Sequence, residues 1–396
     1  MKIKKIVGEV KNNNILLLQG PMGSFFNTLD EKFKKDEANT FRIGFNAADE
    51  YFAKSNQYTG YKDIPKNWPN FISNYYKTYK IDKLFVFGDC RFYQKYAIKI
   101  AKENNIEVYV FEEGYLRPNF ITLEKYGVNN HSTIPRNRDF YDNLNLDDDV
   151  ILEIEHLENF GSTYNKMAWE ATVYYFLGNL FYYKYPNYKH HRCFSFLKEG
   201  WIGIVNFTRK NINRIKERNL NNYFEKELSN KYYFVPLQTY NDFQIITHSK
   251  YNSIEEFIKE VLISFSKHAP KDKYLVFKHH PMDRGKKNYK KYIDFYSNYY
   301  GIKHRVIITW DVHLPTLLKH SIGSIMINST VGIQSLYHKA PTICLGKAIY
   351  DIEGLTSKGL SLDEFWENYK EVDQELFRKY RTYLIQTTQV NSNFYL

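Results

Sequence analysis

Short apolar segments alternate with amphipathic segments along the first 120 residues of the chain. Each apolar segment is followed by polar residues with glycine or proline, which is the pattern of buried strands in a parallel sheet. The predicted strands are residues 15–18, 41–45, 84–87 and 108–111, and residues 92–103 have helical spacing. Strand, helix and strand in this rhythm predict βαβ units.

A second series of the same kind begins near residue 231. Ser253 and Glu256 form a capping box at the start of one predicted helix. The predicted strands are residues 232–237, 274–277, 306–309, 322–327 and 341–345, and the predicted helices are about 254–267, 330–338 and 371–389. The sequence therefore predicts an α/β protein with two Rossmann-like lobes, residues 1–150 and 231–370.

Residues 151–230 differ in composition from both predicted lobes. Aromatic residues are concentrated over residues 174–188 and basic residues over 189–218, mostly at helical spacing. This composition predicts a helical insert that contacts anionic lipid or, equally well, packs on the lobes as an arm. Residues 371–396 are predicted to form a C-terminal helix that crosses back to the N-terminal lobe.

Composition narrows the class of protein. The chain has 396 residues, 43% of them hydrophobic, which is typical of a folded protein with two cores. The net charge of +11 suits acidic partners, but it is equally explained by the excess of residues with A/T-rich codons. No RRM, KH or helix-turn-helix pattern accompanies the charge, so no nucleic-acid partner is expected.

Cysteines and apolar runs indicate the compartment. The three cysteines, Cys90, Cys193 and Cys344, are widely spaced and form no CxxC pair, which fits a reducing cytoplasm. No apolar run is long enough for a signal peptide or a membrane span. We expect a protein that is soluble or attached to a membrane surface.

The most informative polar cluster is Lys278-His279-His280-Pro281, directly after the predicted strand 274–277. Ligands of open α/β sheets bind at the carboxyl ends of the strands. One lysine and two histidines there form a donor group suited to an anionic phosphate or carboxylate.

A second polar cluster, Asn328-Ser329-Thr330, lies between a predicted strand and a predicted helix. Hydroxyls and free N–H groups at a helix N-terminus can bind an anion. Taken alone, the cluster is better explained as an ordinary N-cap. Its position one strand away from the histidine-proline cluster favours the anion site.

The predicted N-terminal lobe has two candidate positions of its own. Gln19-Gly20-Pro21 forms a turn that could hold an anion, although a tight strand-to-helix connection explains it better. Glu112 and Glu113 follow a predicted strand and precede Gly114 and Pro118. They are placed for acid/base chemistry or are a solvated pair, and the residues alone do not decide between these.

An ordered series of motifs over about 340 residues resembles the capsule-polysaccharide β-Kdo transferases of Gram-negative bacteria, the KpsS and KpsC group. The motifs are LLQGP at 17–21 with Phe25-Phe26, Gly88-Asp89, FEEGYLRP at 111–118, ITLE at 121–124 with Gly127-Val128-Asn129, PLQ at 236–238 with Asp242, KHHP at 278–281, NSTVG at 328–332 and Tyr350-Asp351 with GLT at 354–356. The single-unit length resembles the S-type initiating enzyme.

The resemblance implies a GT-B-like fold with an interlobe cleft and a retaining, metal-independent transferase without a cofactor. The implied donor is CMP-β-Kdo, and the implied acceptor is a phosphatidylglycerol-type lipid, so that the reaction starts the poly-Kdo linker of capsular polysaccharide. The implied location is the inner face of the cytoplasmic membrane, with other capsule assembly proteins as further partners.

The resemblance also implies residue roles. Asp242 is the candidate nucleophile, and Glu113, less favoured Glu112, is the candidate acid/base. The donor would be bound by Lys278, His280, Pro281, Asn328, Ser329, Thr330, Gln238 and Tyr350, and the acceptor side of the cleft would include Gly20, Pro21 and Arg117. Position 353 is Glu where the pattern has Pro, which leaves the part of that segment in donor binding open.

Two alternatives differ from this hypothesis in class. One is a non-catalytic lipid- or polysaccharide-binding component of capsule export, which would use the aromatic and basic insert. The other is a CMP-sialic acid transferase, which shares the CMP chemistry and a histidine-proline motif.

Overall fold

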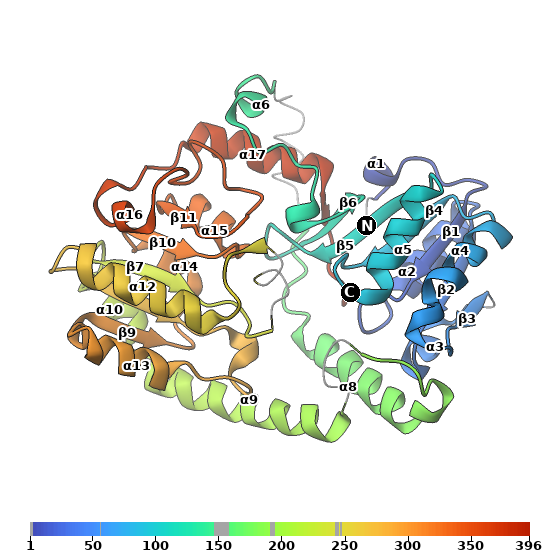
Figure 1. Ribbon diagram of the computed structural model, residues 1–396, viewed down its shortest axis with the longest axis horizontal. Coiled ribbons are helices and arrows are strands. Elements are labelled where there is room, and N and C mark those ends of the chain that lie inside the picture. The colour runs from blue at the N-terminus through green and yellow to red at the C-terminus, as the bar shows by residue number, and fades with distance from the viewer. Residues whose placement is uncertain (1–2, 56, 146–157, 191–194, 242–244, 246–247) are drawn as a thin grey trace. The chain divides into compact units, whose positions relative to one another are not determined.

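The computed structural model describes residues 3–55, 57–145, 158–190, 195–241, 245 and 248–396. The chain forms two compact units, which are described separately (Figure 1). Unit 1 comprises Met1–Thr133, Asp147–Gly200 and Tyr383–Leu396, and unit 2 comprises Ile134–Leu146 and Trp201–Thr382.

Unit 1 is built on a sheet of seven strands in the order β12-β6-β5-β4-β1-β2-β3. The strands from β1 to β5 are parallel, β6 is antiparallel to β5, and β12 is antiparallel to β6. The five parallel strands therefore have the order 3-2-1-4-5, which is that of a Rossmann half. The strands are β1 (Asn14–Leu18), β2 (Asn39–Gly44), β3 (Tyr58–Gly60), β4 (Lys83–Phe87), β5 (Glu107–Glu113), β6 (Phe120–Lys125) and β12 (Gln389–Asn391).

Both faces of this sheet are buried, which explains the uninterrupted apolar run of β1. Ile15 and Leu17 pack with residues of α2 on one face, and Leu16 and Leu18 pack with residues of α4 on the other. The described helices of unit 1 are α1 (Lys4–Val7), α2 (Phe25–Lys35), α3 (Ala47–Ala53), η1 (Pro65–Asn67), α4 (Trp68–Thr78), α5 (Phe92–Glu103), η2 (Asn129–His131), α8 (Tyr164–Leu180) and η3 (Tyr182–Lys184).

Unit 2 contains a five-stranded parallel sheet in the order β11-β10-β7-β8-β9, again the 3-2-1-4-5 arrangement. The strands are β7 (Tyr232–Pro236), β8 (Tyr274–Lys278), β9 (Val306–Thr309), β10 (Gly323–Met326) and β11 (Thr342–Cys344). The described helices that lie wholly in this unit are α6 (Arg138–Asp142), α10 (Leu220–Lys226), α12 (Ile254–His268), η4 (Pro281–Asp283), α13 (Lys290–Tyr299), η5 (Lys303–Arg305), α14 (Leu314–Lys319), α15 (Val331–Tyr337) and α16 (Leu362–Asn368).

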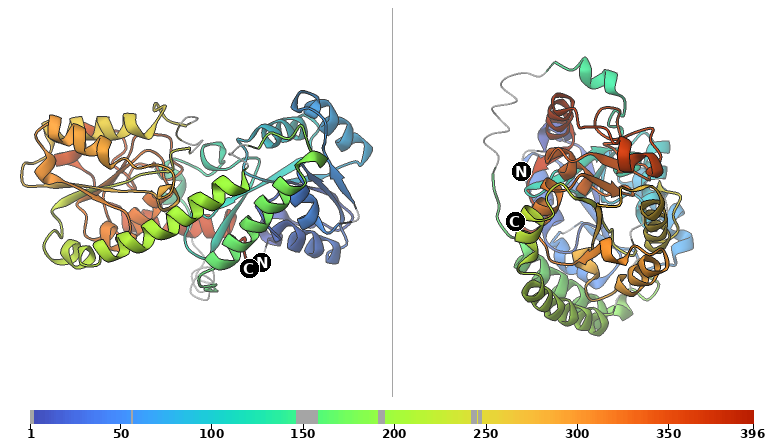
Figure 2. Two further views of the ribbon diagram at one scale, coloured as in Figure 1. Left: turned by 90° about the horizontal axis from the view of Figure 1, so that it is seen from below. Right: turned by 90° about the vertical axis from the view of Figure 1, so that its left-hand side faces the viewer.

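Two helices continue from one unit into the other. Helix α9 (Phe196–Lys216) begins in unit 1 and has most of its length in unit 2, and Figure 2 shows it as one uninterrupted helix. Helix α17 (Gln374–Thr387) begins in unit 2, and the chain after it supplies β12 to the sheet of unit 1. Among the described residues, no helix is both long enough and apolar enough to cross a membrane.

The α/β class with two Rossmann-like units is confirmed. Each predicted strand matches an observed strand to within two residues at either end, whereas β3, β6 and β12 were not predicted. The described part of the predicted insert, residues 151–230, is mainly helical and contributes α8 to unit 1 and α10 to unit 2. The bounds of the four predicted segments (1–150, 151–230, 231–370 and 371–396) and the interlobe cleft stay predictions.

Candidate functional site

The order of strands in unit 2 reverses between β7 and β10, and this switch point is where open α/β sheets bind ligands. Gln238 follows β7 and Asn328 follows β10. The Gln238 amide Nε2 donates to Asn328 Oδ1 at 3.0 Å, and the Asn328 backbone N–H donates to Gln238 Oε1 at 3.3 Å. The structure thus brings two of the predicted donor-binding residues together at the switch point.

Strand β8, next to β7, ends at Lys278, whose side chain is buried. Its ammonium donates to the carbonyl oxygen of Trp310 at 2.8 Å. Burial lowers the pKa of Lys278 to about 8, while the nearby carboxylates of Asp311 and Glu217 act in the opposite direction. A buried ammonium with donor capacity to spare is suited to bind an anionic phosphate.

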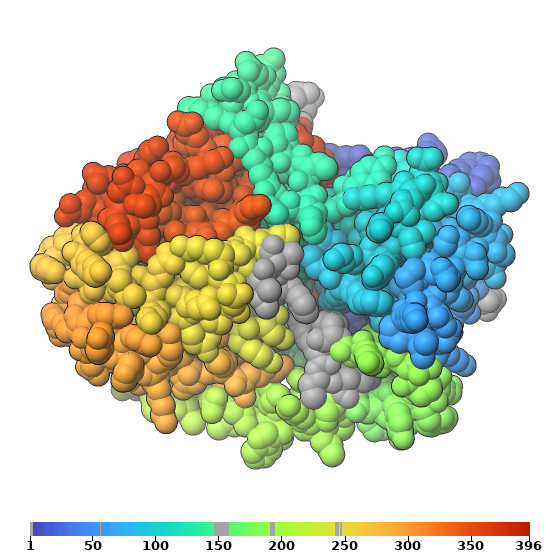
Figure 3. Space-filling view, viewed as in Figure 1, coloured from blue at the N-terminus to red at the C-terminus, as the bar shows by residue number. Residues whose placement is uncertain are grey.

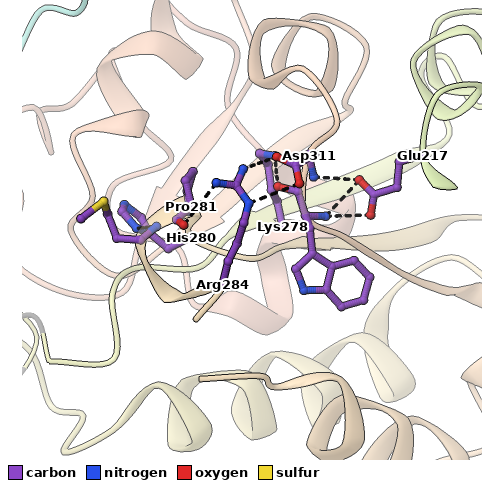
Figure 4. Close-up of polar contacts among 8 residues, drawn as sticks. Glu217, Lys278, His280, Pro281, Arg284 and Asp311 are labelled. Atoms are coloured by element: carbon purple, nitrogen blue, oxygen red, sulfur yellow. Dashed lines mark hydrogen bonds and ion pairs between the residues drawn. The ribbon is translucent and has the colours of Figure 1, made fainter. Parts of the chain in front are cut away.

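The histidine-proline turn continues directly from β8. His280 is partly exposed and caps η4, because its Nδ1 accepts a hydrogen bond from the backbone N–H of Met282 at 3.2 Å. Pro281 occupies the first position of η4, where a proline costs no hydrogen bond. Figure 4 shows Lys278, His280 and Pro281 in the same region of unit 2.

His279 is oriented differently from its neighbour. It is buried, and its ring is stacked on Trp310 (centroids 5.2 Å apart) and on Tyr289 (5.4 Å). Burial lowers the pKa of His279 to about 4, so that the ring is neutral near pH 7. The sequence placed His279 with Lys278 and His280 in one hydrogen-bond donor group, whereas its buried ring packs on Trp310 and Tyr289.

A charged network that the sequence did not reveal holds this edge of the sheet (Figure 4). Arg284 donates to Asp311 through Nε at 3.2 Å and through Nη2, and its Nη1 donates to the Pro281 carbonyl at 3.3 Å. The Glu217 carboxylate accepts from the backbone N–H groups of Trp310 at 3.0 Å and Asp311 at 2.7 Å. Asp311 lies just after a predicted strand, so its position in the sequence could have identified it as a site residue. Glu217 comes from the insert, and nothing in the sequence pattern pointed to a role for it at this edge.

The Asn-Ser-Thr cluster is held by Tyr350. The Tyr350 hydroxyl is buried and donates to the Ser329 carbonyl at 2.5 Å, and Ser329 Oγ accepts from the Val331 backbone N–H at 3.3 Å. Thr330 is partly exposed and makes no side-chain cap on α15. Tyr350 is therefore placed to position Ser329, and direct contact between Tyr350 and a donor stays a prediction.

The proposed nucleophile, Asp242, lies outside the described residues. The loop that leads to it is anchored in unit 2, because the Tyr240 backbone N–H donates to the buried carboxylate of Asp283 at 2.9 Å. Asp283 belongs to η4, the turn that His280 caps.

In unit 1, Gln19 and Gly20 follow β1 at the corresponding switch point. Gln19 is buried and donates through Nε2 to Asp49 Oδ2 at 3.0 Å. A Cβ on Gly20 would lie 2.6 Å from the Phe26 ring, and Pro21 is buried. These contacts agree with the interpretation of the segment as a tight connection between strand and helix.

The two candidate acids, Glu112 and Glu113, lie in β5, so their side chains point to opposite faces of the sheet. Glu112 is half-buried, and burial raises its pKa to about 7 although the Glu113 backbone N–H donates to it at 3.0 Å. Glu113 is exposed, and its Oε2 lies 3.9 Å from Arg117 Nη2. The Nε of Arg117 donates to the Gly114 carbonyl at 3.1 Å.

Asp89 is a residue of this edge to which the sequence assigned no role. It follows β4 and is buried, and its Oδ2 accepts from the Val128 backbone N–H at 3.1 Å and lies 3.0 Å from His131 Nδ1. The negative charge of Asp89 also helps to raise the pKa of Glu112. The Gly88-Asp89 motif after a predicted strand was the available signal.

Comparison with known proteins shows the family. Residues 82–395 match the model of the capsule polysaccharide biosynthesis proteins, and the chain belongs to that family. It is 40% identical to the capsule polysaccharide export protein KpsS of Escherichia coli, over 96% of both chains. It is also 39% identical to the capsule polysaccharide modification protein LipB of Neisseria meningitidis serogroup A, over 96% of this chain and 91% of the relative. The resemblance to the KpsS group is thereby confirmed.

Solved structures are more distant. The KpsC β-Kdo 2,7 transferase of Thermosulfurimonas dismutans has a TM-score of 0.42 at 14% identity, with 93% of this chain and 89% of that chain covered. A glycosyltransferase from Rickettsia africae has a TM-score of 0.36 at 11% identity, with 95% and 89% covered. We draw no functional conclusion from structural similarities with such low TM-scores and sequence identities.

Proposed function

We propose that this protein is a retaining β-Kdo glycosyltransferase that transfers Kdo from CMP-β-Kdo to a phosphatidylglycerol-type lipid and so initiates the poly-Kdo linker of capsular polysaccharide. The observation that carries the proposal is the row of polar groups at the carboxyl ends of three adjacent strands: Lys278 at the end of β8, Gln238 after β7 and Asn328 after β10. Membership of the capsule polysaccharide biosynthesis family supports it.

The donor phosphate would bind at this edge of unit 2. The ammonium of Lys278 supplies positive charge in a buried setting, and the His280 ring and the Ser329 hydroxyl supply further hydrogen-bonding groups. Groups that are held in place before the reaction stabilise the negative charge of departing CMP without reorganisation. No metal or cofactor forms part of the proposal.

The proposed chemistry is a double displacement. The Asp242 carboxylate attacks the anomeric carbon of Kdo and CMP leaves with the bonding electrons. The acceptor hydroxyl then attacks the same carbon, loses its proton to a glutamate and releases Asp242, so that two inversions retain the configuration. The role of Asp242 as nucleophile and the preference for Glu113 as proton acceptor rest on the family resemblance. The raised pKa of the Glu112 carboxyl favours Glu112 as the proton acceptor instead.

The proposed location is the inner face of the cytoplasmic membrane, where the donor and a lipid acceptor would meet. Other capsule assembly proteins are proposed as further partners. The export function in the name of the Escherichia coli relative supports a second candidate, a non-catalytic component that binds lipid or polysaccharide during capsule export.

Mass spectrometry of the acceptor separates these candidates. The full-length protein is incubated with CMP-Kdo and a fluorescent phosphatidylglycerol analogue, and the proposal predicts that the acceptor gains the mass of one or two Kdo residues. Excess CMP-sialic acid should neither be transferred nor compete. An acceptor of unchanged mass, bound by the protein, would favour the non-catalytic component, and transfer of sialic acid would favour the sialyltransferase.

A further inference from the structure

The part of helix α9 that belongs to unit 2 presents large apolar side chains to solvent. Their exposed fractions range from 44 to 69%. Their spacings of three, three, five and three residues place them within one broad helix face. We call this surface the α9 apolar face, and it consists of Trp201, Ile204, Phe207, Ile212 and Ile215.

Contacts within unit 2 fix which face of α9 is exposed. Ile202 packs closely on Gly285: a Cβ added at Gly285 would lie 2.6 Å from the Ile202 carbonyl oxygen. Arg209 donates through Nη1 to the carbonyl of Arg284, and Glu217 beyond the helix accepts from backbone N–H groups of the turn after β9. These three contacts hold the opposite side of the helix on the unit, so the apolar face cannot be buried by a rotation of α9 in place.

Positive charge accompanies the apolar face. Residues 209–218 contain five basic side chains and one acidic side chain, Glu217, which is buried against backbone N–H groups. An amphipathic helix with aromatic and aliphatic residues on one side and flanking cations has the composition of helices that lie in a membrane interface. The basic residues are Arg209, which lies on the opposite side of the helix through its contact with Arg284, and Lys210, Arg214, Lys216 and Arg218.

We propose that the α9 apolar face binds the surface of an anionic phospholipid bilayer, with its apolar side chains below the headgroups and the neighbouring cations on the phosphates. The inference deepens the proposed function, since a lipid acceptor would lie in the same bilayer. A second copy of the chain is a poorer occupant, because pairing two such faces would bring like charges together. The surface of part of this segment is visible in yellow-green in Figure 3.

Vesicle co-sedimentation tests the surface. The full-length protein is mixed with phosphatidylglycerol-containing vesicles or with neutral phosphatidylcholine vesicles, at low and at high salt. The variant W201Q/I204Q/I215Q removes apolar groups and keeps good helix formers, and R214Q/K216Q removes charge. The matched control, F295Q/Y299Q, removes two exposed aromatic side chains from α13, which are 62 and 74% exposed.

The wild type and the control should bind anionic vesicles more tightly than neutral ones. The apolar variant should bind roughly a thousandfold more weakly, since each of the three large apolar side chains withdrawn from water contributes about a factor of ten. The charge variant should lose the preference for anionic lipid and its salt dependence. The proposal would be overturned if the apolar variant bound vesicles as tightly as the wild type. It would also be overturned if the wild type and the other variants were dimers and the apolar variant were a monomer with unchanged vesicle binding.

A separate readout keeps this inference apart from the transferase proposal. Transfer of Kdo to a short water-soluble acceptor should be the same in the apolar variant as in the wild type. If the wild type binds vesicles through α9 but transfers no Kdo, the transferase proposal fails and the surface stands. If the wild type transfers Kdo but does not bind vesicles, the proposed membrane surface fails and the transferase proposal stands.

Discussion

The Glu217 carboxylate accepts a hydrogen bond from the backbone N–H of Asp311 at 2.7 Å, which ties the end of the α9 segment to the turn after β9. The same carboxylate accepts from the N–H of Trp310, whose carbonyl receives the ammonium of Lys278. Glu217 is therefore a positioning residue, because it orients the peptide groups that hold Lys278.

Replacing Glu217 by Ala should weaken CMP binding by about tenfold, because two partly buried N–H groups lose their acceptor and the turn that holds Lys278 relaxes. The free energy of unfolding should fall by about 1–3 kcal/mol, the usual result of leaving donors unpaired away from bulk water. Calorimetric titration with CMP and thermal denaturation measure the two effects. Glu227→Ala, at an exposed position near the end of α10, is the control, and equal CMP affinity in both variants would contradict the positioning role.

The pH dependence of CMP binding follows from the lowered pKa of Lys278. Because this ammonium loses its proton as the pH rises through about 8, the affinity for CMP should fall between pH 7 and pH 9. An anionic phosphate favours the charged form, so binding near pH 8 should be accompanied by proton uptake. Titrations in buffers of different ionisation enthalpy measure that uptake.

Lys278→Met should abolish both the pH dependence and most of the affinity, whereas the exposed Lys319→Met should change neither. A wild-type affinity that is constant from pH 7 to pH 9 would argue against phosphate binding by Lys278.

Gly332 is required by the position of Tyr350. A Cβ at Gly332 would lie 2.1 Å from the Tyr350 hydroxyl, which is itself held by the Ser329 carbonyl. Gly332→Ala should therefore lower the free energy of unfolding by about 1–3 kcal/mol, the cost of overpacking a buried site. Gly203→Ala is the matched control: nothing lies within 4 Å of its added Cβ in α9, and the change should stabilise by about 0.5–1 kcal/mol. Chemical denaturation of both variants checks the opposite signs.

The pH profile of transfer distinguishes Glu112 from Glu113. If Glu112 accepts the acceptor proton, it must be deprotonated, so kcat should rise with pH through about 7, the raised pKa of this carboxyl. Glu112→Gln should then lose most of its kcat and Glu113→Gln should keep the rise near pH 7. A wild-type profile that Glu112→Gln leaves intact would assign the proton transfer to Glu113 instead, as the family resemblance implies.

Much of the fold followed from apolar periodicity. Runs such as residues 15–18 and 274–277 are apolar at every position because parallel strands are buried on both faces. The three strands that were not predicted are short, as in β3 and β12, or carry polar residues, as in β6 with Thr122 and Glu124. Periodicity gives little signal for strands as short as β3 and β12, and β6 is placed by its antiparallel pairing with β5 and β12.

The candidate site was predictable only at the ends of strands. Lys278, Gln238 and Asn328 follow predicted strands, and the structure places them on neighbouring strands of one sheet. The sequence could not show that His279 packs into the core, nor that Glu217, about 60 residues before Lys278 on the α9 segment, supports the same edge. Both facts depend on tertiary packing between segments that are far apart in the chain.

A crystal structure with bound CMP is the decisive test of the donor site. The phosphate should lie at the carboxyl edge of the unit 2 sheet, within hydrogen-bonding distance of Lys278 Nζ or the His280 ring. CMP bound in unit 1, or on unit 2 away from the histidine-proline turn, would contradict it.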